Sequence, residues 1–263
     1  MKLTEINIYP VKSLAGISLQ SSPLDAMGLR YDRRWMLVTP AGKFITQRTH
    51  PQMALIQPQL PDGVLTLTRQ GMLDHHVPAV STDRMSMQVE IWNDGVNALC
   101  ISDETDAWLT QAIDAPCRLI YIAEDEIRQC DLQYAEAGDR TGFADGFPLL
   151  LISQASLDDL NGRLQQPLPM RRFRPNLVVS GCDPYAEDGW RKILIGDIRL
   201  RVVKPCSRCV ITTVDPETGV KGAGEPLRTL AGYRMRDKQV YFGQNLIHQQ
   251  HGVLSVNQEV IAE

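Results

Sequence analysis

Apolar and polar positions alternate along the first third of the chain, which is the period-2 pattern of half-buried β-strands. Ile6 and Ile8 alternate with polar neighbours, and apolar side chains at 85, 87, 89 and 91 form the clearest alternation in the sequence. Turn-forming residues recur between such runs, at 41–42, 61–63 and 93–95. This part of the chain is therefore predicted to form antiparallel hairpins.

Two segments show the longer period of an amphipathic helix. In the first, apolar residues at 108, 109, 112 and 113 share one face, and Ser102 or Asp103 can serve as the N-cap. In the second, leucines at 157, 160 and 164 share a face, Ser153 or Ser156 can cap the start, and Pro167 follows the end. Two short helices are therefore predicted among the strands.

The strand pattern returns in the last third of the chain. Apolar runs at 177–180, 193–195 and 198–203 read as strands, and Gly196-Asp197 predicts a tight hairpin between the last two. The polar segment 124–142 has no clear period and predicts a long loop. Strands outnumber helices, and few parallel βαβ units can be drawn. The predicted fold is mainly β, with two intimately packed β-barrel-like parts and a few short helices.

Composition narrows the functional classes. The chain has 263 residues and a formal net charge of −4, which argues against a general nucleic-acid-binding protein. Its longest apolar run, at 147–152, is far too short to cross a membrane. The N-terminus has no signal-peptide pattern, and the six cysteines are too sparse for a disulfide scaffold. We therefore expect a cytoplasmic protein that binds neither nucleic acid nor membrane.

The charge is distributed unevenly. Residues 170–209 contain nine basic side chains and four acidic ones, although the whole chain is acidic. This basic segment ends at the one close pair of cysteines, Cys206 and Cys209. A local positive charge of this kind favours a small anionic ligand.

The cysteine pair alone leaves several interpretations open. A structural zinc site needs four ligands, usually in two pairs, and the His75-His76 pair lies more than a hundred residues away. A redox-active dithiol needs a helix after its first cysteine, whereas β-branched residues at 212–214 and Pro216 oppose a helix.

Two other interpretations do not require the two cysteines to act as a pair. One cysteine could be the thiolate ligand of a soft metal carried by an anionic cofactor, with Lys204 and Arg208 favouring the charged form. Alternatively, both cysteines could be buried packing residues, as free cysteines often are.

Four separated motifs, in this order, resemble those of the MOSC family, the proteins related to the C-terminal domain of molybdenum cofactor sulfurase. The resemblance extends from about residue 3 to residue 260 and is greatest to bacterial YcbX-like proteins and mitochondrial amidoxime-reducing components. It implies an N-terminal MOSC-associated β domain over residues 1–118 and a MOSC domain over 119–263. The motifs are Tyr9-Pro10-Val11-Lys12-Ser13, Gly28-Leu29-Arg30-Tyr31-Asp32-Arg33-Arg34-Trp35-Met36, Arg172-Phe173-Arg174-Pro175-Asn176 and Cys206-Ser207-Arg208-Cys209.

The resemblance implies a molybdenum cofactor and a set of site residues. Cys209 corresponds to the cysteine that binds the metal and is the first candidate catalytic residue. Asp145, in the loop before the central apolar strand, is the second, because it could relay a proton or order a water. The implied cofactor-binding residues are Lys12, Ser13, Arg33, Arg174, Asn176, Ser207, Arg208 and Asn245.

The family also implies an activity, the reduction of small N-hydroxylated compounds (N-oxygenated bases and amidoximes) to the parent base. A non-catalytic carrier of molybdenum cofactor or sulfur is the alternative. No cysteine follows Cys209, so the sequence contains no ferredoxin-type cysteine cluster after it. A reductase of this kind would therefore take electrons from a separate donor, either a ferredoxin-like domain or protein or another reductase.

Overall fold

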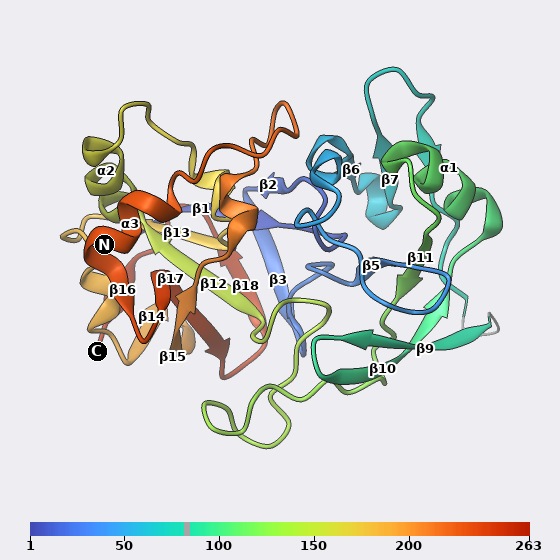
Figure 1. Cartoon of the computed structure of the whole chain (residues 1–263). Helices are drawn as coiled ribbons and strands as arrows, with labels where there is room; N and C mark the ends of the chain where they lie inside the picture. The colour runs from blue at the N-terminus through green and yellow to red at the C-terminus, as the bar shows by residue number, and fades with distance from the viewer. Residues whose placement is uncertain (82–84) are drawn as a thin grey trace.

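The structure is a computed structural model that describes residues 1–81 and 85–263. Over these residues the strands form four sheets, and three short α-helices pack beside them (Figure 1). The mainly-β prediction is therefore confirmed. No helix in the described part of the chain is long and apolar enough to cross a membrane.

The largest sheet has nine strands and is built mostly from the C-terminal half. Its order is β19-β14-β15-β17-β12-β13-β1-β2, and β16 pairs with β17 outside this path. The pairs are antiparallel except for β12 and β13, which run parallel. Its strands are β1 (Lys2–Ile8), β2 (Ile17–Leu19), β12 (Leu149–Ser153), β13 (Leu177–Ser180), β14 (Lys192–Ile195), β15 (Ile198–Ser207), β16 (Met235–Arg236), β17 (Gln239–His248) and β19 (Val260–Ala262).

Three smaller sheets complete the β-structure. The first has the order β5-β11-β10-β9, the second β18-β3-β4 and the third β6-β7-β8. Their strands are β3 (Ser21–Asp25), β4 (Gly28–Leu29), β5 (Trp35–Val38), β6 (Gln57–Gln59), β7 (Thr66–Thr68), β8 (His75–His76), β9 (Ser86–Ile91), β10 (Asp94–Cys100), β11 (Arg118–Tyr121) and β18 (Gly252–Ser255).

The first strands of the chain pack with the last ones. β1 lies between β13 and β2 in the large sheet, and β3 pairs with β18 (Figure 1). The core beneath the large sheet is therefore shared, since Leu3 and Ile6 pack with Leu177 and Leu246, all of them fully buried. Each such side chain contributes about 1.5–3 kcal/mol to folding. The predicted boundary between residues 118 and 119 falls within β11 and stays a prediction.

Two of the three helices lie where the sequence predicts them. α1 (Asp103–Ile113) begins after Ser102, whose side chain accepts a hydrogen bond from the Thr105 N–H. α2 (Gln154–Arg163) begins after Ser153, which accepts from the Ser156 N–H. These are the bonds expected of serine N-caps.

The third helix, α3 (Leu227–Arg234), is not predicted from the sequence. It has eight residues and no side-chain cap, and Leu230 is its only buried residue. A single buried position gives no period to detect. The remaining helical turns are 3-10 turns: η1 (Pro51–Leu55), η2 (Pro61–Gly63), η3 (Met170–Arg172), η4 (Ala186–Asp188) and η5 (Val210–Thr213).

One strand is longer than predicted, and it leads into the cysteine pair. β15 continues past Val203 to Ser207 and pairs with β17 along its length, with register shifts at Val202/Lys204 and Pro205/Ser207. Such irregularities bend a strand and redirect its side chains. The end of β15 thus carries Cys206, and Cys209 follows immediately before η5.

Candidate functional site

All ten predicted site residues line one cavity of about 120 Å³ between the two halves of the chain. The N-terminal half supplies its wall around residues 12–13, 33 and 46–48. The C-terminal half supplies the loop before β12, the turn before β13, the end of β15 and part of β17. The ten are Lys12, Ser13, Arg33, Asp145, Arg174, Asn176, Ser207, Arg208, Cys209 and Asn245.

The two cysteines have different surroundings. The Sγ of Cys206 accepts a hydrogen bond from Arg208 Nη1 at 2.9 Å, whereas the Sγ of Cys209 accepts from Arg48 Nη2 at 3.6 Å. Burial raises the pKa of the Cys206 thiol, and the Arg208 charge only partly opposes that effect. Both thiols are free. The pair therefore consists of two distinct sites rather than one symmetric motif.

Neither a structural zinc site nor a thioredoxin-type dithiol fits this geometry. Within residues 1–81 and 85–263, no three His, Cys, Asp or Glu side chains gather in a way that could hold a metal. Cys206 belongs to a strand, and only a four-residue 3-10 turn follows Cys209. A dithiol of that type requires an α-helix to lower the thiol pKa.

Three of the basic and polar residues at the site occur in an unusual backbone conformation. Ser13, Arg33 and Arg174 have φ values of +67°, +48° and +56°. This left-handed region is disfavoured for residues other than glycine, and such strain is concentrated at functional sites. The sharp turns direct side chains from three separate segments into the same cavity.

Tyr9 connects two of these arginines. The guanidinium of Arg33 lies 4.3 Å and that of Arg174 4.1 Å from the centre of its ring. Its hydroxyl donates to the Pro175 carbonyl at 3.1 Å. Burial raises the pKa of Tyr9 to about 12, against the opposing effect of the two cations. Burial also lowers the pKa of Arg174 to about 10, so this guanidinium remains charged at neutral pH.

Asn176 fixes the relative positions of the two halves. Its amide oxygen accepts from Arg33 Nη1 at 3.0 Å and from the Leu150 N–H at 3.1 Å, while its amide nitrogen donates to the Asn7 carbonyl at 3.1 Å. Asn245 instead connects two strands of the C-terminal half, because its side chain in β17 donates to the Lys204 carbonyl in β15 at 3.1 Å. Both line the cavity, and their cofactor-binding roles stay predictions.

Lys12 and Asp145 form an ion pair across the cavity. The Lys12 ammonium donates to Asp145 Oδ1 at 2.5 Å and to the Phe143 carbonyl at 2.9 Å. The lysine side chain is 7% exposed and the aspartate side chain 63%. Desolvation lowers the pKa of Lys12, and the neighbouring carboxylate opposes that shift.

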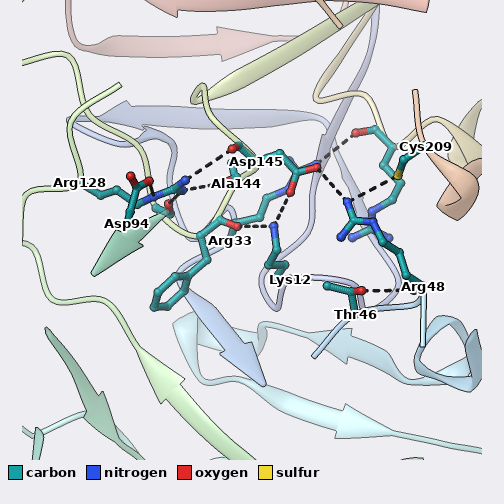
Figure 2. Close-up of polar contacts among 12 residues, drawn as sticks. Lys12, Arg33, Thr46, Arg48, Asp94, Arg128, Ala144, Asp145 and Cys209 are labelled. Atoms are coloured by element: carbon teal, nitrogen blue, oxygen red, sulfur yellow. Dashed lines mark hydrogen bonds and ion pairs between the residues drawn. The ribbon is translucent and has the colours of Figure 1, made fainter. Parts of the chain in front are cut away.

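Asp145 also faces Arg48, whose Nη2 lies 4.0 Å from Oδ2, so the carboxylate is placed between two cations (Figure 2). Desolvation acts to raise its pKa. The charges of Lys12 and Arg48 outweigh that effect and hold the pKa of this carboxyl well below its usual range. Asp145 is therefore ionised at neutral pH.

Arg128 holds the loop that carries Asp145, and sequence reasoning missed it. Its guanidinium donates to the carbonyls of Gly142 and Ala144 at 2.9 and 2.5 Å, and to Asp94 Oδ2 at 2.8 Å (Figure 2). It comes from the polar segment 124–142, which has no period and no motif. The only available signal was the length of this predicted loop, since long loops are often functional.

The cavity carries an excess of positive charge. Its lining includes five cationic side chains and one carboxylate. Asp145 pairs with Lys12, and Arg33 pairs with Asp32 outside the lining, so the excess is on the other three arginines. Among the described residues, the buried Nε of Arg208 has no hydrogen-bond partner. Cations that are partly removed from water and not neutralised are costly to maintain unless an anion binds. The cationic lining residues are Lys12, Arg33, Arg48, Arg174 and Arg208.

A larger cavity of about 750 Å³ adjoins this one, and the two share Arg174 and Ile211 as lining residues. The larger cavity is also lined by arginines, at 69, 171 and 172. The site thus adjoins a second, more spacious basic region.

Comparison with known proteins gives two family matches. Residues 1–116 match the model of the MOSC N-terminal beta barrel domain, and residues 138–261 match that of the MOSC domain.

Individual relatives match over nearly the whole chain. Mitochondrial amidoxime-reducing component 1 of Mus musculus is 35% identical, over 96% of this chain and 77% of the relative. Its Homo sapiens counterpart is 34% identical, over 98% and 82%. Molybdenum cofactor sulfurase of Solanum lycopersicum is 33% identical over 92% of this chain, but only 32% of the sulfurase is covered.

Proposed function

The chain belongs to the MOSC family, in the group that joins a MOSC N-terminal β-barrel domain to a MOSC domain, and from this premise we propose that it is a molybdenum-cofactor-dependent reductase of N-hydroxylated compounds. The similarity to amidoxime-reducing components supports a reductase. The observation that carries the proposal is the cavity itself, which is lined by two thiols and five cationic side chains.

The residues present fit an anionic cofactor that carries a soft metal. Lys12, Arg33 and Arg174 supply the charge-assisted hydrogen bonds that a phosphate requires. Cys209 supplies a thiol, the donor that soft metals prefer. When bound, the cofactor supplies the two-electron redox chemistry that the protein's own side chains lack.

The protein's contribution is to bind and orient the reactants. Reduction of an N–OH group to N–H consumes two electrons and two protons and releases water. Because Asp145 is ionised at neutral pH, its role in this scheme is to accept a hydrogen bond from a water or a substrate N–H rather than to donate a proton. The electrons come from a separate donor, either a ferredoxin-like domain or protein or another reductase.

The alternative is a carrier that holds the cofactor, or sulfur on Cys209, and transfers it without turnover. The match to molybdenum cofactor sulfurase favours this reading. The two functions share the cofactor cavity and differ in whether a substrate is reduced. Turnover therefore decides between them.

The experiment compares the two cysteines. Wild type, Cys209→Ser and Cys206→Ser are loaded with cofactor and assayed with an N-hydroxylated amidine and an artificial reductant, and molybdenum content and EPR are recorded. We expect turnover by wild type, substantial turnover by Cys206→Ser, and loss of turnover with an altered metal spectrum in Cys209→Ser.

Equal loss in both variants would contradict the assignment of Cys209 as the single ligand. Bound molybdenum cofactor without any turnover in wild type would support the carrier instead. A protein that takes up no molybdenum would exclude both the reductase and the carrier of molybdenum cofactor.

A further inference from the structure

Arg48 is the cation in contact with the Cys209 thiol. It belongs to none of the sequence motifs and is not among the residues proposed to bind the cofactor. It lies in the segment between β5 and η1, where its N–H donates to Thr46 Oγ1 at 3.2 Å (Figure 2). Its Nη2 reaches Cys209 Sγ at 3.6 Å and lies 4.0 Å from Asp145 Oδ2. One guanidinium thus contacts both predicted catalytic residues.

Trp92, between β9 and β10, determines where this guanidinium lies. The Arg48 guanidinium is 4.6 Å from the centre of the Trp92 ring, a cation–π contact, and Phe44 packs against the same ring at 5.2 Å. Trp92 has φ +57°, a conformation rare for a bulky residue, and is 40% exposed. An exposed, strained aromatic residue in a hairpin turn contributes little to a core, and its ring instead packs between Phe44 and the Arg48 guanidinium.

Among the described residues, both polar side-chain contacts of the Arg48 guanidinium are made by Nη2. One is the hydrogen bond to the Cys209 sulfur at 3.6 Å, and the other is the 4.0 Å contact with Asp145 Oδ2, which is longer than an ordinary charge-assisted hydrogen bond. The side chain is 23% exposed. It therefore keeps hydrogen-bonding capacity directed toward the space beside Cys209.

We propose that Arg48 is the substrate-positioning residue of this site: it binds an oxygen atom of the ligand that approaches Cys209, and Trp92 holds it in place. In the reaction proposed above, that oxygen is the one of the N–O group. This deepens the proposed function and rests on it for the identity of the substrate. A guanidinium suits the task because its planar array of donors recognises oxygen and it stays charged at every working pH.

The first test needs neither cofactor nor turnover. The full cofactor-free chain is alkylated with iodoacetate, which carries a carboxylate, and in parallel with the neutral iodoacetamide. The rate with iodoacetate divided by the rate with iodoacetamide at Cys209 measures the positive charge next to the thiol. A change in the fraction of thiolate alters both rates equally and leaves their ratio unchanged. Trypsin cleaves after Arg208, so Cys206 and Cys209 fall on separate peptides and are quantified separately by mass spectrometry.

We expect Arg48→Gln to lower the iodoacetate-to-iodoacetamide ratio at Cys209 about fivefold, which is the effect of one unit charge about 4 Å away in water. Arg48→Lys should restore most of the ratio. Trp92→Asn, which tolerates the same backbone conformation, should lower the ratio by a smaller factor because the guanidinium is released. The ratio at Cys206, held by Arg208, and the ratio in the exposed-site control Arg30→Gln should not change. An unchanged ratio at Cys209 in Arg48→Gln would overturn the proposal.

The second test uses the cofactor-loaded protein with the N-hydroxylated amidine. Loss of a charge-assisted hydrogen bond to the substrate should raise KM about tenfold or more in Arg48→Gln, with a smaller change in kcat, and Arg48→Lys should recover part of it. A fall in kcat alone, with KM unchanged, would overturn the substrate-positioning role. If the wild type shows no turnover, the proposed function fails, and the alkylation ratio still decides whether Arg48 receives an anionic ligand at Cys209.

Discussion

Asp145 is the anion that neutralises the buried Lys12 in the structure. The lysine ammonium has few other partners, since besides this carboxylate it donates only to the Phe143 carbonyl in the part of the chain that is described. A carboxyl with a depressed pKa stabilises the fold above its ordinary pKa of 3.8, and that contribution disappears as the pH falls through its folded-state value. The acid stability of the protein should therefore depend on this residue.

We expect Asp145→Asn to reduce the free energy of unfolding of the cofactor-free protein at pH 7 by about 1–2 kcal/mol, between the values of exposed and buried ion pairs. The difference from wild type should shrink as the pH falls below about 4, because the carboxyl then takes up a proton in the unfolded chain while it is still ionised in the folded protein. Urea unfolding between pH 7 and pH 3 measures this, with the exposed Asp125→Asn as the control. A difference that is constant over that range would show that the ion pair is not its source.

At the level of single residues, the motifs predicted many of the residues that line the cavity. They did not predict two residues whose contacts hold that lining in position. Eight of the ten predicted residues converge because the motifs that contain them are turns and strand ends that the fold brings to one place. Arg48 and Arg128 belong to no motif. Their importance arises from neighbours far away in sequence, Cys209 and Ala144, and no local pattern contains that information.

Among the elements, β17 packs so closely against β12 beside the site that a glycine is needed at the point of contact. Gly243 has φ +82°, and a Cβ atom there would lie 2.6 Å from Ile152 Cγ1 and 2.8 Å from the Leu151 carbonyl oxygen. Both atoms belong to a central strand and cannot easily move. The glycine is therefore required by the packing of the sheet as well as by its own backbone.

We expect Gly243→Ala to lower the free energy of unfolding by about 2–4 kcal/mol, since it combines backbone strain with overpacking. Gly232→Ala is the matched control. Gly232 lies inside α3 with no atom within 4 Å of the added Cβ, so this change should be neutral or stabilise by up to about 1 kcal/mol. Chemical denaturation of both variants is the measurement, and equal effects would contradict the packing argument.

Element positions were more predictable than element partners. Alternation located the strand at β1, because a period of two marks a half-buried strand wherever it pairs. Two apolar runs joined by the Gly196-Asp197 turn located the hairpin of β14 and β15. The pairing of β1 with β13 could not be predicted, since alternation defines the two faces of a strand and not its neighbour. The turn residues predicted only hairpins between strands adjacent in sequence.

For the whole molecule, the shared sheet means that the C-terminal half depends on the N-terminal one. Residues 119–263 alone would lack β1 as a partner for β13, and with it the Lys12 and Arg33 side of the cavity. An unpaired apolar strand edge is prone to aggregation.

We therefore expect the fragment 119–263 to show no cooperative thermal unfolding when produced alone, and to regain it when the fragment 1–118 is produced with it. Calorimetry and analytical size exclusion check both statements. Cooperative unfolding of the isolated fragment 119–263 would mean that the large sheet is stable without its N-terminal strands.

The position of β1 has a further consequence during protein synthesis. Ile6 pairs with Leu177, so about 170 residues must be translated before this strand meets its partner. At bacterial or eukaryotic rates of about 5–20 residues per second, that interval is roughly ten to thirty seconds. Leu3, Ile6 and Ile8, all buried in the finished fold, emerge from the ribosome first, and for most of that time the short strand β2 is the only neighbour from the large sheet that can pair with them. The nascent chain therefore needs the ribosome surface or a chaperone to shield its first strand until the sheet can close.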